Sequence, residues 1–255
     1  MHLSEEQIIM TFDQLAREVV LGYGPYESVR LECDGYPLEF RICPTLSRKP
    51  NAIGKMLDAS FDLSRRWSPG SDRLKITVLN NTHDLSVNLF CVDRPQLLLL
   101  TLDSYRRQHE PLDSDDFNAA LTLIRDPPSI FGIFIGGGAA GCSRVRKHMQ
   151  GLRGPPFAFD LFTSEDKKTI PFKFYSHQFV DGLGVTTASD PVEMYEVLLR
   201  QSRDALSSYG LQETEPSSAN AGGMMGSIWV SEKRVADAWA ELGYRNVFET
   251  LGVPR

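Results

Sequence analysis

Short runs in which apolar and polar residues alternate recur along this 255-residue chain, separated by Gly, Pro and Asp turn signals. Because successive side chains of a strand point to opposite faces, each run predicts a strand with one buried face. The run 97–102 is apolar except for Thr101, which is typical of a strand buried in the centre of a sheet. Strands are expected over residues 29–33, 38–42, 74–79, 85–92, 97–102, 130–135, 143–152, 173–179 and 225–230.

Helical periodicity interrupts these strands. Apolar residues recur at spacings of three and four from residue 5 to residue 20, and Ser4 can cap the start. Pro191 suits the first position of another helix. Strands interrupted by helices favour an α+β fold with a mostly antiparallel sheet flanked by helices. Helices are expected over residues 5–20, 115–125, 191–208 and 231–242, and loops over 44–72 and 211–222.

The composition is that of an ordinary soluble globular protein, with 42% hydrophobic and 24% charged residues. Its net charge of −6 argues against binding to nucleic acid or to an anionic membrane surface. We see neither a secretory signal nor an apolar run long enough to span a bilayer. The four cysteines form no C-x-x-C pair. We therefore expect a cytoplasmic protein with free thiols and no structural metal site.

The segment most informative about chemistry follows the glycines 136–138. On a strand, Arg144, Arg146, His148 and Gln150 share one face. Arginine binds phosphate oxygens in bidentate fashion, and a glycine-rich backbone lets a ligand approach closely. Within this row, only the imidazole can serve as both nucleophile and acid/base near neutral pH. The row therefore predicts an anion site, and an exposed strand face without a ligand is the alternative left open by the spacing.

Other polar residues have structural explanations that we prefer. His83 and His177 each stand alone on an alternating run, where histidine is more often structural. Cys142 is best interpreted as a small buried residue. Three acids, Asp113, Asp115 and Asp116, fit the capping of the helix that follows better than a paired-carboxylate site.

Residues 141–150 resemble the Gly-x-Ser-x-x-His-x-His-x-Gln signature of the fungal diadenosine tetraphosphate phosphorylases (ATP adenylyltransferases). That family belongs to the histidine-triad and galactose-1-phosphate uridylyltransferase superfamily. The resemblance implies a single histidine-triad-like domain over 1–255, with 1–39 as a divergent N-terminal extension. Further stretches resemble the family in the same order along the chain, at 43–52, 83–90, 97–101, 170–174, 219–226 and 251–254.

The resemblance also implies a reaction, namely nucleotidyl transfer to and from a histidine. By position, His148 is the nucleophile that attacks an α-phosphorus, and Gln150 holds a nonbridging phosphate oxygen. Neither a metal nor a cofactor is implied, and the expected partner is a phosphate-bearing small molecule. The residues that match substrate-binding positions, or stand beside them, are Lys49, Asn88, Gly137, Ser143, Arg144 and Arg146.

Several positions depart from the family pattern. Arg146 stands where the family has its first histidine, and Arg144 where it has a glutamine. Leu89 and Ile135 replace a lysine and an asparagine. Arginine restores positive charge but cannot act as an acid or base at neutral pH. The region between Tyr209 and Ala219 also looks too short for a strand pair of the family, and a homodimer that covers the resulting sheet edge is expected.

Three functions stay open on the sequence alone. The first is a nucleotidyltransferase or phosphorylase acting on a nucleoside polyphosphate through a nucleotidyl-His148 intermediate. The second is a repurposed member that catalyses a different reaction, for example in specialised metabolism, with His148 as acid/base. The third is a catalytically inactive binding protein. We favour the first, since the His-x-Gln pair, Lys49 and Ser143 are all retained.

Overall fold

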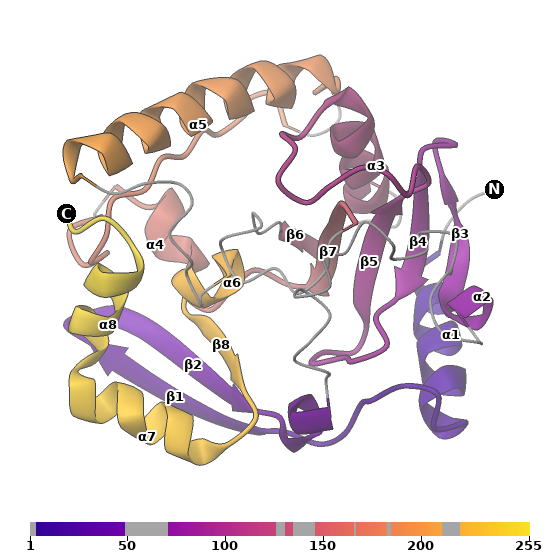
Figure 1. Cartoon of the computed structure of the whole chain (residues 1–255), viewed down its shortest axis with the longest axis horizontal. Helices are drawn as coiled ribbons and strands as arrows, with labels where there is room; N and C mark the ends of the chain where they lie inside the picture. The colour runs from indigo at the N-terminus through magenta and orange to yellow at the C-terminus, as the bar shows by residue number, and fades with distance from the viewer. Residues whose placement is uncertain are drawn as a thin grey trace.

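The structure is a computed structural model that describes residues 4–48, 71–125, 131–134, 146–165, 167–182, 185–210 and 220–255. These residues form an α+β fold with two β-sheets and helices packed beside them (Figure 1). One sheet is five-stranded in the order β3-β4-β5-β7-β6, and all its neighbouring strands are antiparallel. The other is three-stranded in the order β1-β2-β8, and only the β2–β8 pair is parallel. The predicted fold class, α+β with a mostly antiparallel sheet flanked by helices, is confirmed.

Strand β5 (Gln96–Thr101) is the central strand of the larger sheet, and all six of its residues are buried. Its register with β7 places Leu98 opposite Gln150 and Leu100 opposite His148. Because opposite residues of an antiparallel pair share a face, these four side chains lie on one side of the sheet. The other strands are β3 (Lys75–Leu79), β4 (His83–Val87), β6 (Phe131–Phe134) and β7 (His148–Arg153).

Helices α1 (Glu5–Arg17) and α3 (Ser114–Arg125) pack against the opposite face of this sheet. Helix α1 begins with a capping box, in which the Ser4 hydroxyl accepts from the Gln7 backbone and the Gln7 side chain accepts from the Ser4 N–H. The apolar faces of both helices meet alternate residues of the strands. The buried cluster between them consists of Ile8, Leu79, Leu85, Leu97, Leu99, Ala119, Ala120, Leu123 and Met149.

The smaller sheet starts with a hairpin. Asp34 and Gly35 form its turn with φ values of 51° and 81°, the left-handed conformation that suits a two-residue Asp-Gly connection. Helices α7 and α8 cover the sheet and share an aromatic cluster with it (Figure 1). The elements of this part are β1 (Glu27–Cys33), β2 (Tyr36–Ile42), β8 (Ser227–Val230), α7 (Lys233–Leu242) and α8 (Tyr244–Leu251).

A long helix, α5 (Ser189–Ser208), borders the fold and touches α3 through Tyr195 and Phe117, whose ring centroids are 5.9 Å apart. Among the described residues, none of the helices combines the length and the apolar character needed to cross a membrane. The short elements are α2 (Ser71–Leu74), α4 (Phe159–Thr163), α6 (Ala221–Met224) and the 3-10 helix η1 (Pro44–Arg48).

Most of the expected elements are present, with ends shifted by a few residues. The run 85–92 is a strand only over His83–Val87, and the run 143–152 becomes regular only at His148. Part of the stretch expected as loop between 44 and 72 is helical, namely η1 and α2, and most of the rest lies outside the described residues. Helix α8 was not expected.

The predicted strand over 173–179 is wrong. Alternation is present there, but the segment has no secondary structure, and its side chains are largely exposed. The backbone is held near this point by Phe172, which forms an isolated bridge with Pro254, and by Lys173, whose N–H donates to Val253 O. Alternation indicates a strand only where a neighbouring strand is available to satisfy the backbone.

Shortening Leu99 tests the central position of β5. Leu99 is fully buried between the two neighbouring strands, so Leu99→Ala leaves a cavity and should lower the free energy of unfolding by about 2–5 kcal/mol. Denaturant unfolding measures this change. The control is Val180→Ala, because Val180 is 89% exposed and its truncation should stay within about 0.5 kcal/mol. Equal effects of the two substitutions would contradict the assignment of β5 as the core strand.

Candidate active site

His148 is the first residue of β7 and is only 4% exposed. Its Nδ1 lies 2.9 Å from the backbone carbonyl oxygen of Arg146. Because a carbonyl oxygen can only accept, Nδ1 carries the proton, and Nε2 of the neutral ring therefore keeps its lone pair. A contact between two residues of the same segment thus sets the tautomer in which Nε2 is the nucleophilic nitrogen.

The backbone of His148 is held by the side chain of Gln108. The Gln108 Oε1 accepts from the His148 N–H at 2.9 Å, and its Nε2 donates to the His148 carbonyl at 3.1 Å. Among the described residues, strand β6 pairs with β7 from Gln150 to Arg153. At His148 the buried amide of Gln108 therefore supplies the donor and the acceptor that a neighbouring strand residue would supply.

Gln150 lies two residues along β7, on the same face of the sheet as His148. Its Oε1 accepts from Nε2 of Gln96 at 3.0 Å. The backbone oxygen of Gln96 in turn accepts from the N–H of Asn88 at 2.8 Å. The structure thus places His148 and Gln150 on one face of β7, opposite Leu100 and Leu98, whereas Asn88 contacts the backbone at the other end of β5, at Gln96.

Arg146 is anchored on the backbone. Its Nε donates to the carbonyl of Thr101 at 2.8 Å, and its Nη2 donates to the same oxygen. Burial lowers the pKa of Arg146 from its ordinary value, and the carboxylates of Asp84 and Asp103 oppose this effect. The guanidinium stays charged at neutral pH. A fixed positive charge therefore lies two residues before the candidate nucleophile.

The other predicted ligand-binding residues lie outside the described part of the chain. These are Lys49, Gly137, Ser143 and Arg144. Ile135, a departure from the family pattern, and Cys142, interpreted as a small buried residue, lie there too. Their roles stay predictions, and so does the single face formed by Arg144, Arg146, His148 and Gln150. Among the described residues, no group of three His, Cys, Asp or Glu side chains is placed to hold a metal ion.

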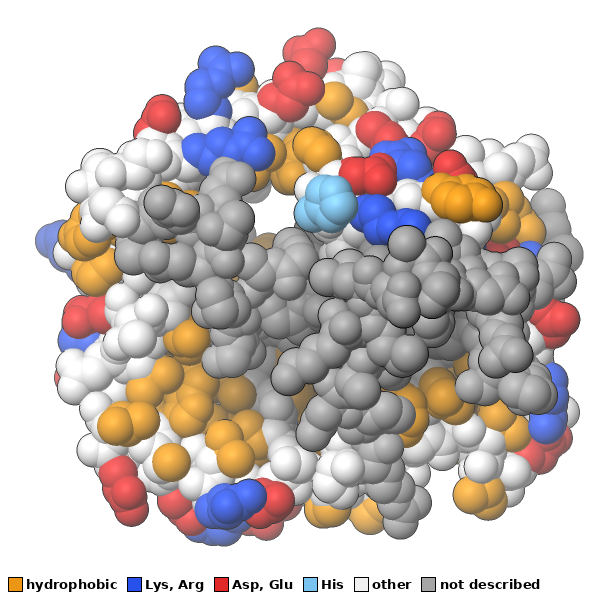
Figure 2. Space-filling model, in the orientation of Figure 1, with side chains coloured by type: hydrophobic (Ala, Val, Ile, Leu, Met, Phe, Trp, Pro, Cys, Tyr) orange, Lys and Arg blue, Asp and Glu red, His pale blue; other side chains and the backbone are white. Residues whose placement is uncertain are grey.

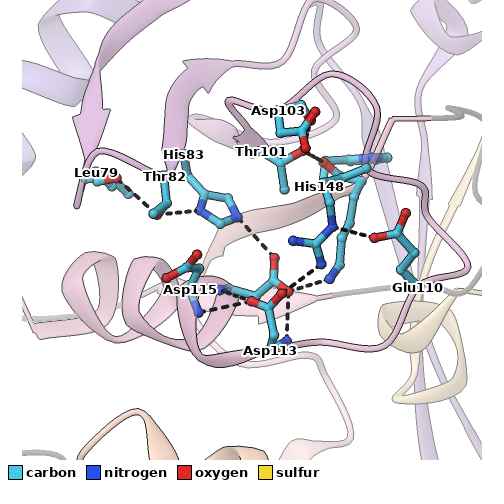
Figure 3. A network of polar contacts seen from close by, with 12 residues as sticks. Leu79, Thr82, His83, Thr101, Asp103, Glu110, Asp113, Asp115 and His148 are labelled. Atoms are coloured by element: carbon cyan, nitrogen blue, oxygen red, sulfur yellow. Dashed lines mark hydrogen bonds and ion pairs between the residues drawn. The ribbon is translucent and has the colours of Figure 1, made fainter.

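Behind this face lies a network of buried charges that the sequence interpretation missed. Lys147 and Asp116 are 1% and 2% exposed, and their Nζ and Oδ2 atoms are 2.5 Å apart. The other carboxylate oxygen of Asp116 lies 3.1 Å from Nε2 of His83, whose ring points toward α3 (Figure 3). Lys147 also donates to the carbonyl of Pro111. The network ties β4, β7 and α3 together directly behind the strand that carries His148.

Asp116 has two functions in this arrangement. Its Oδ2 accepts from the N–H of Asp113, while Oδ1 of Asp113 accepts from the N–H of Asp116, which is a reciprocal cap at the start of α3. Burial opposes ionisation, but hydrogen bonds from His83 and Lys147 outweigh it and hold the pKa of Asp116 well below its ordinary value. The capping interpretation is confirmed for Asp113 and is incomplete for Asp116.

The other residues considered as functional candidates, His177 and the cysteines, have contacts or burial typical of structural residues. His177 is exposed and its ring meets that of Phe179 edge-on, with centroids 4.7 Å apart. Of the cysteines in the described part, Cys43 and Cys91 are buried and Cys33 is half-buried, all as free thiols. Figure 2 shows basic and acidic side chains interspersed around the rim of the visible face.

The sequence of residues 25–172, more than half of the chain, matches the family described as Ap4A phosphorylase N-terminal domain. The chain belongs to the Ap4A phosphorylase family. No curated protein sequence matches it. The family resemblance predicted from residues 141–150 is therefore confirmed at the level of the family, although the sequence has diverged.

Crystal structures of the yeast Ap4A phosphorylase Apa2 show the same fold. The structure in complex with AMP has a TM-score of 0.74 at 17% identity, over 100% of this chain and 98% of that chain. The structure in complex with Ap4A has a TM-score of 0.72 at 19% identity, over 100% and 99%. A third Apa2 structure gives 0.74 at 16% identity, over 100% and 99%. The fold expected for this Ap4A phosphorylase family member is confirmed.

Acid should weaken the fold of this Ap4A phosphorylase family member through Asp116. Its pKa is depressed in the folded state, so its contribution is complete above the unfolded carboxyl pKa of about 3.9 and is lost as the pH falls further. Asp116→Asn should cost about 3–5 kcal/mol at pH 7, because Lys147 then stays buried without its counter-ion. Denaturant unfolding from pH 7 to pH 3 measures the difference in free energy of unfolding between wild type and Asp116→Asn. This difference should become smaller below about pH 4.

Asp115→Asn is the matched control, because Asp115 is exposed on the first turn of the same helix. Its effect should stay below about 1 kcal/mol, the range of an exposed charge near a helix start. A gap between wild type and Asp116→Asn that is small or independent of pH would contradict the buried ion pair.

Proposed function

We propose that this protein is a phosphorylase or nucleotidyltransferase that cleaves a nucleoside polyphosphate through a nucleotidyl-His148 intermediate. The observation that carries the proposal is the contact between Nδ1 of His148 and the Arg146 carbonyl, which places the proton on Nδ1 and so makes Nε2 the nucleophilic nitrogen. Family membership and the complexes of Apa2 with AMP and Ap4A support a phosphate-bearing ligand.

In the first step, Nε2 of His148 attacks the α-phosphorus and the bond to the bridging oxygen breaks. The electron pair leaves with the polyphosphate, which for diadenosine tetraphosphate is ATP. Positive charge develops on the imidazole, and the hydrogen bond from Nδ1–H to the Arg146 carbonyl strengthens as it does. The amide of Gln150 holds a nonbridging oxygen of the phosphorus under attack.

In the second step, inorganic phosphate attacks the nucleotidyl-histidine. The new P–O bond forms as the P–Nε2 bond breaks, which releases ADP and restores the neutral imidazole. Because a polyphosphate leaves readily as an anion, the first step needs no proton donor. The replacement of the family's first histidine by Arg146 is therefore compatible with this chemistry, since a fixed cation beside the phosphates stabilises their charge.

Replacing His148 tests the proposal. Wild-type protein incubated with diadenosine tetraphosphate and phosphate should form ATP and ADP, which chromatography separates. His148→Ala should lower this rate about a thousandfold or more, because the nucleophile is lost. His177→Ala is the control, since His177 is exposed on a segment away from β7 in sequence, and it should keep the wild-type rate.

If the wild type does not turn over diadenosine tetraphosphate, its melting temperature with nucleotide separates the two alternatives, a binding protein and a repurposed enzyme. A nucleotide that raises the melting temperature without being turned over indicates a binding protein, because a ligand stabilises the folded state by mass action. Neither turnover nor a melting shift would indicate a repurposed member with a different substrate.

A further inference from the structure

Gln96, the first residue of β5, joins the backbone to the candidate active site. It is 5% exposed, although the rest of its strand is almost entirely leucine. Its Oε1 accepts from the backbone N–H of Val92 at 2.9 Å, and its Nε2 donates to Oε1 of Gln150 at 3.0 Å. Both ends of this buried amide therefore have a defined partner.

The first of these bonds decides the orientation of the second. A backbone N–H can only donate, so the atom of Gln96 that faces Val92 has to be the oxygen. The amide nitrogen of Gln96 then faces Gln150, and since that nitrogen can only donate, Gln150 has to present its own oxygen. The orientation of the Gln150 amide thus follows from a main-chain group four residues before Gln96.

The consequence for Gln150 is that its Nε2 hydrogens point away from Gln96. Gln150 shares its face of the sheet with His148, because the two residues are separated by one position on β7. The hydrogen bonds from Val92 through Gln96 to Gln150 form a relay. The group that this relay presents beside His148 is therefore a pair of N–H donors rather than a carbonyl oxygen. Donors attract an oxyanion, whereas a carbonyl oxygen would repel it.

We propose that Gln96 is a positioning residue that fixes the Gln150 amide with its donors toward the ligand and so makes the subsite beside His148 selective for phosphate oxygens. The proposal rests on the proposed function for its catalytic consequence. Without Gln96, the amide of Gln150 can rotate and present either end to the substrate. Gln96 touches no substrate itself and acts through Gln150 alone.

Two substitutions of Gln96 separate orientation from packing. Gln96→Glu keeps an acceptor for Val92 but turns an acceptor toward Gln150, which reverses the preferred orientation of the Gln150 amide. Gln96→Met keeps the volume and removes both bonds. We expect kcat/KM for phosphorolysis of diadenosine tetraphosphate to fall about tenfold or more in both variants. Gln201→Glu, at an exposed position of α5, is the control and should not change the rate.

A double-mutant cycle with Gln150→Ala shows whether Gln96 acts through Gln150. If it does, adding Gln96→Glu or Gln96→Met to Gln150→Ala has little further effect on kcat/KM. A merely structural role predicts the same fold-loss in both backgrounds, and that result would overturn the proposal. Melting temperatures identify any variant that fails to fold, and the milder Gln96→Met then serves in the cycle.

A second measurement does not depend on turnover. In protein labelled with ¹⁵N-glutamine, the side-chain amide signals of Gln96 and Gln150 are assigned from their loss in Gln96→Glu and Gln150→Glu. Gln150→Ala should shift the Gln96 signal and speed the exchange of its protons with water, and Gln96→Glu should shift the Gln150 signal. If neither signal responds, the relay does not exist. Wild-type protein that shows the relay but no turnover would refute the proposed function and leave the positioning of Gln150 established.

Discussion

The carboxylate of Asp116 is the group on which the arrangement of the site depends. It receives the ammonium of Lys147 from the residue before β7, the imidazole of His83 from β4, and the backbone N–H of Asp113 from the residue before its own helix. A buried charge left without such partners is strongly destabilising. The two strands and α3 therefore have one relative position in which all three groups are satisfied (Figure 3). The leucines of the neighbouring core cluster pack in that same position.

This buried network also fixes the register of β7. Side chains alternate across a strand, so Lys147 facing α3 requires that His148 faces the other side. A shift by one residue would expose the ammonium on the ligand face and bury the imidazole against Asp116. The network holds the side chain of Lys147, and the amide of Gln108 holds the backbone of the next residue, His148. Together they place an imidazole of defined tautomer on a rigid sheet, as an attacking nucleophile requires.

The sequence predicts what depends on local patterns. The leucine run of β5, the Asp34-Gly35 turn and the acids at the start of α3 each have a local physical cause, and each is found in the structure. The strand over 173–179 was wrong because alternation says nothing about whether a partner strand is present. Gln96 and Gln108 were missed because their partners lie 54 and 40 residues away along the chain. A lone glutamine at the start of an apolar strand was the available signal, since a buried amide needs partners.

The resemblance places Arg146 where the family has its first histidine, and elementary chemistry explains why such an exchange is compatible with a phosphate site. A buried hydrogen bond or ion pair stabilises the fold only when both of its partners are present. Loss of one partner leaves the other polar group buried and unsatisfied. A group beside the phosphates is under a weaker constraint, since any fixed positive charge or donor can stabilise the same oxygens. Arg146 in place of a histidine is such an exchange, and its side chain is secured on the Thr101 carbonyl at the end of β5. This chain and Apa2 share a fold at 16–19% identity, and within that fold the hydrogen bonds of Gln108 and of Arg146 combine a fixed imidazole with a fixed charge.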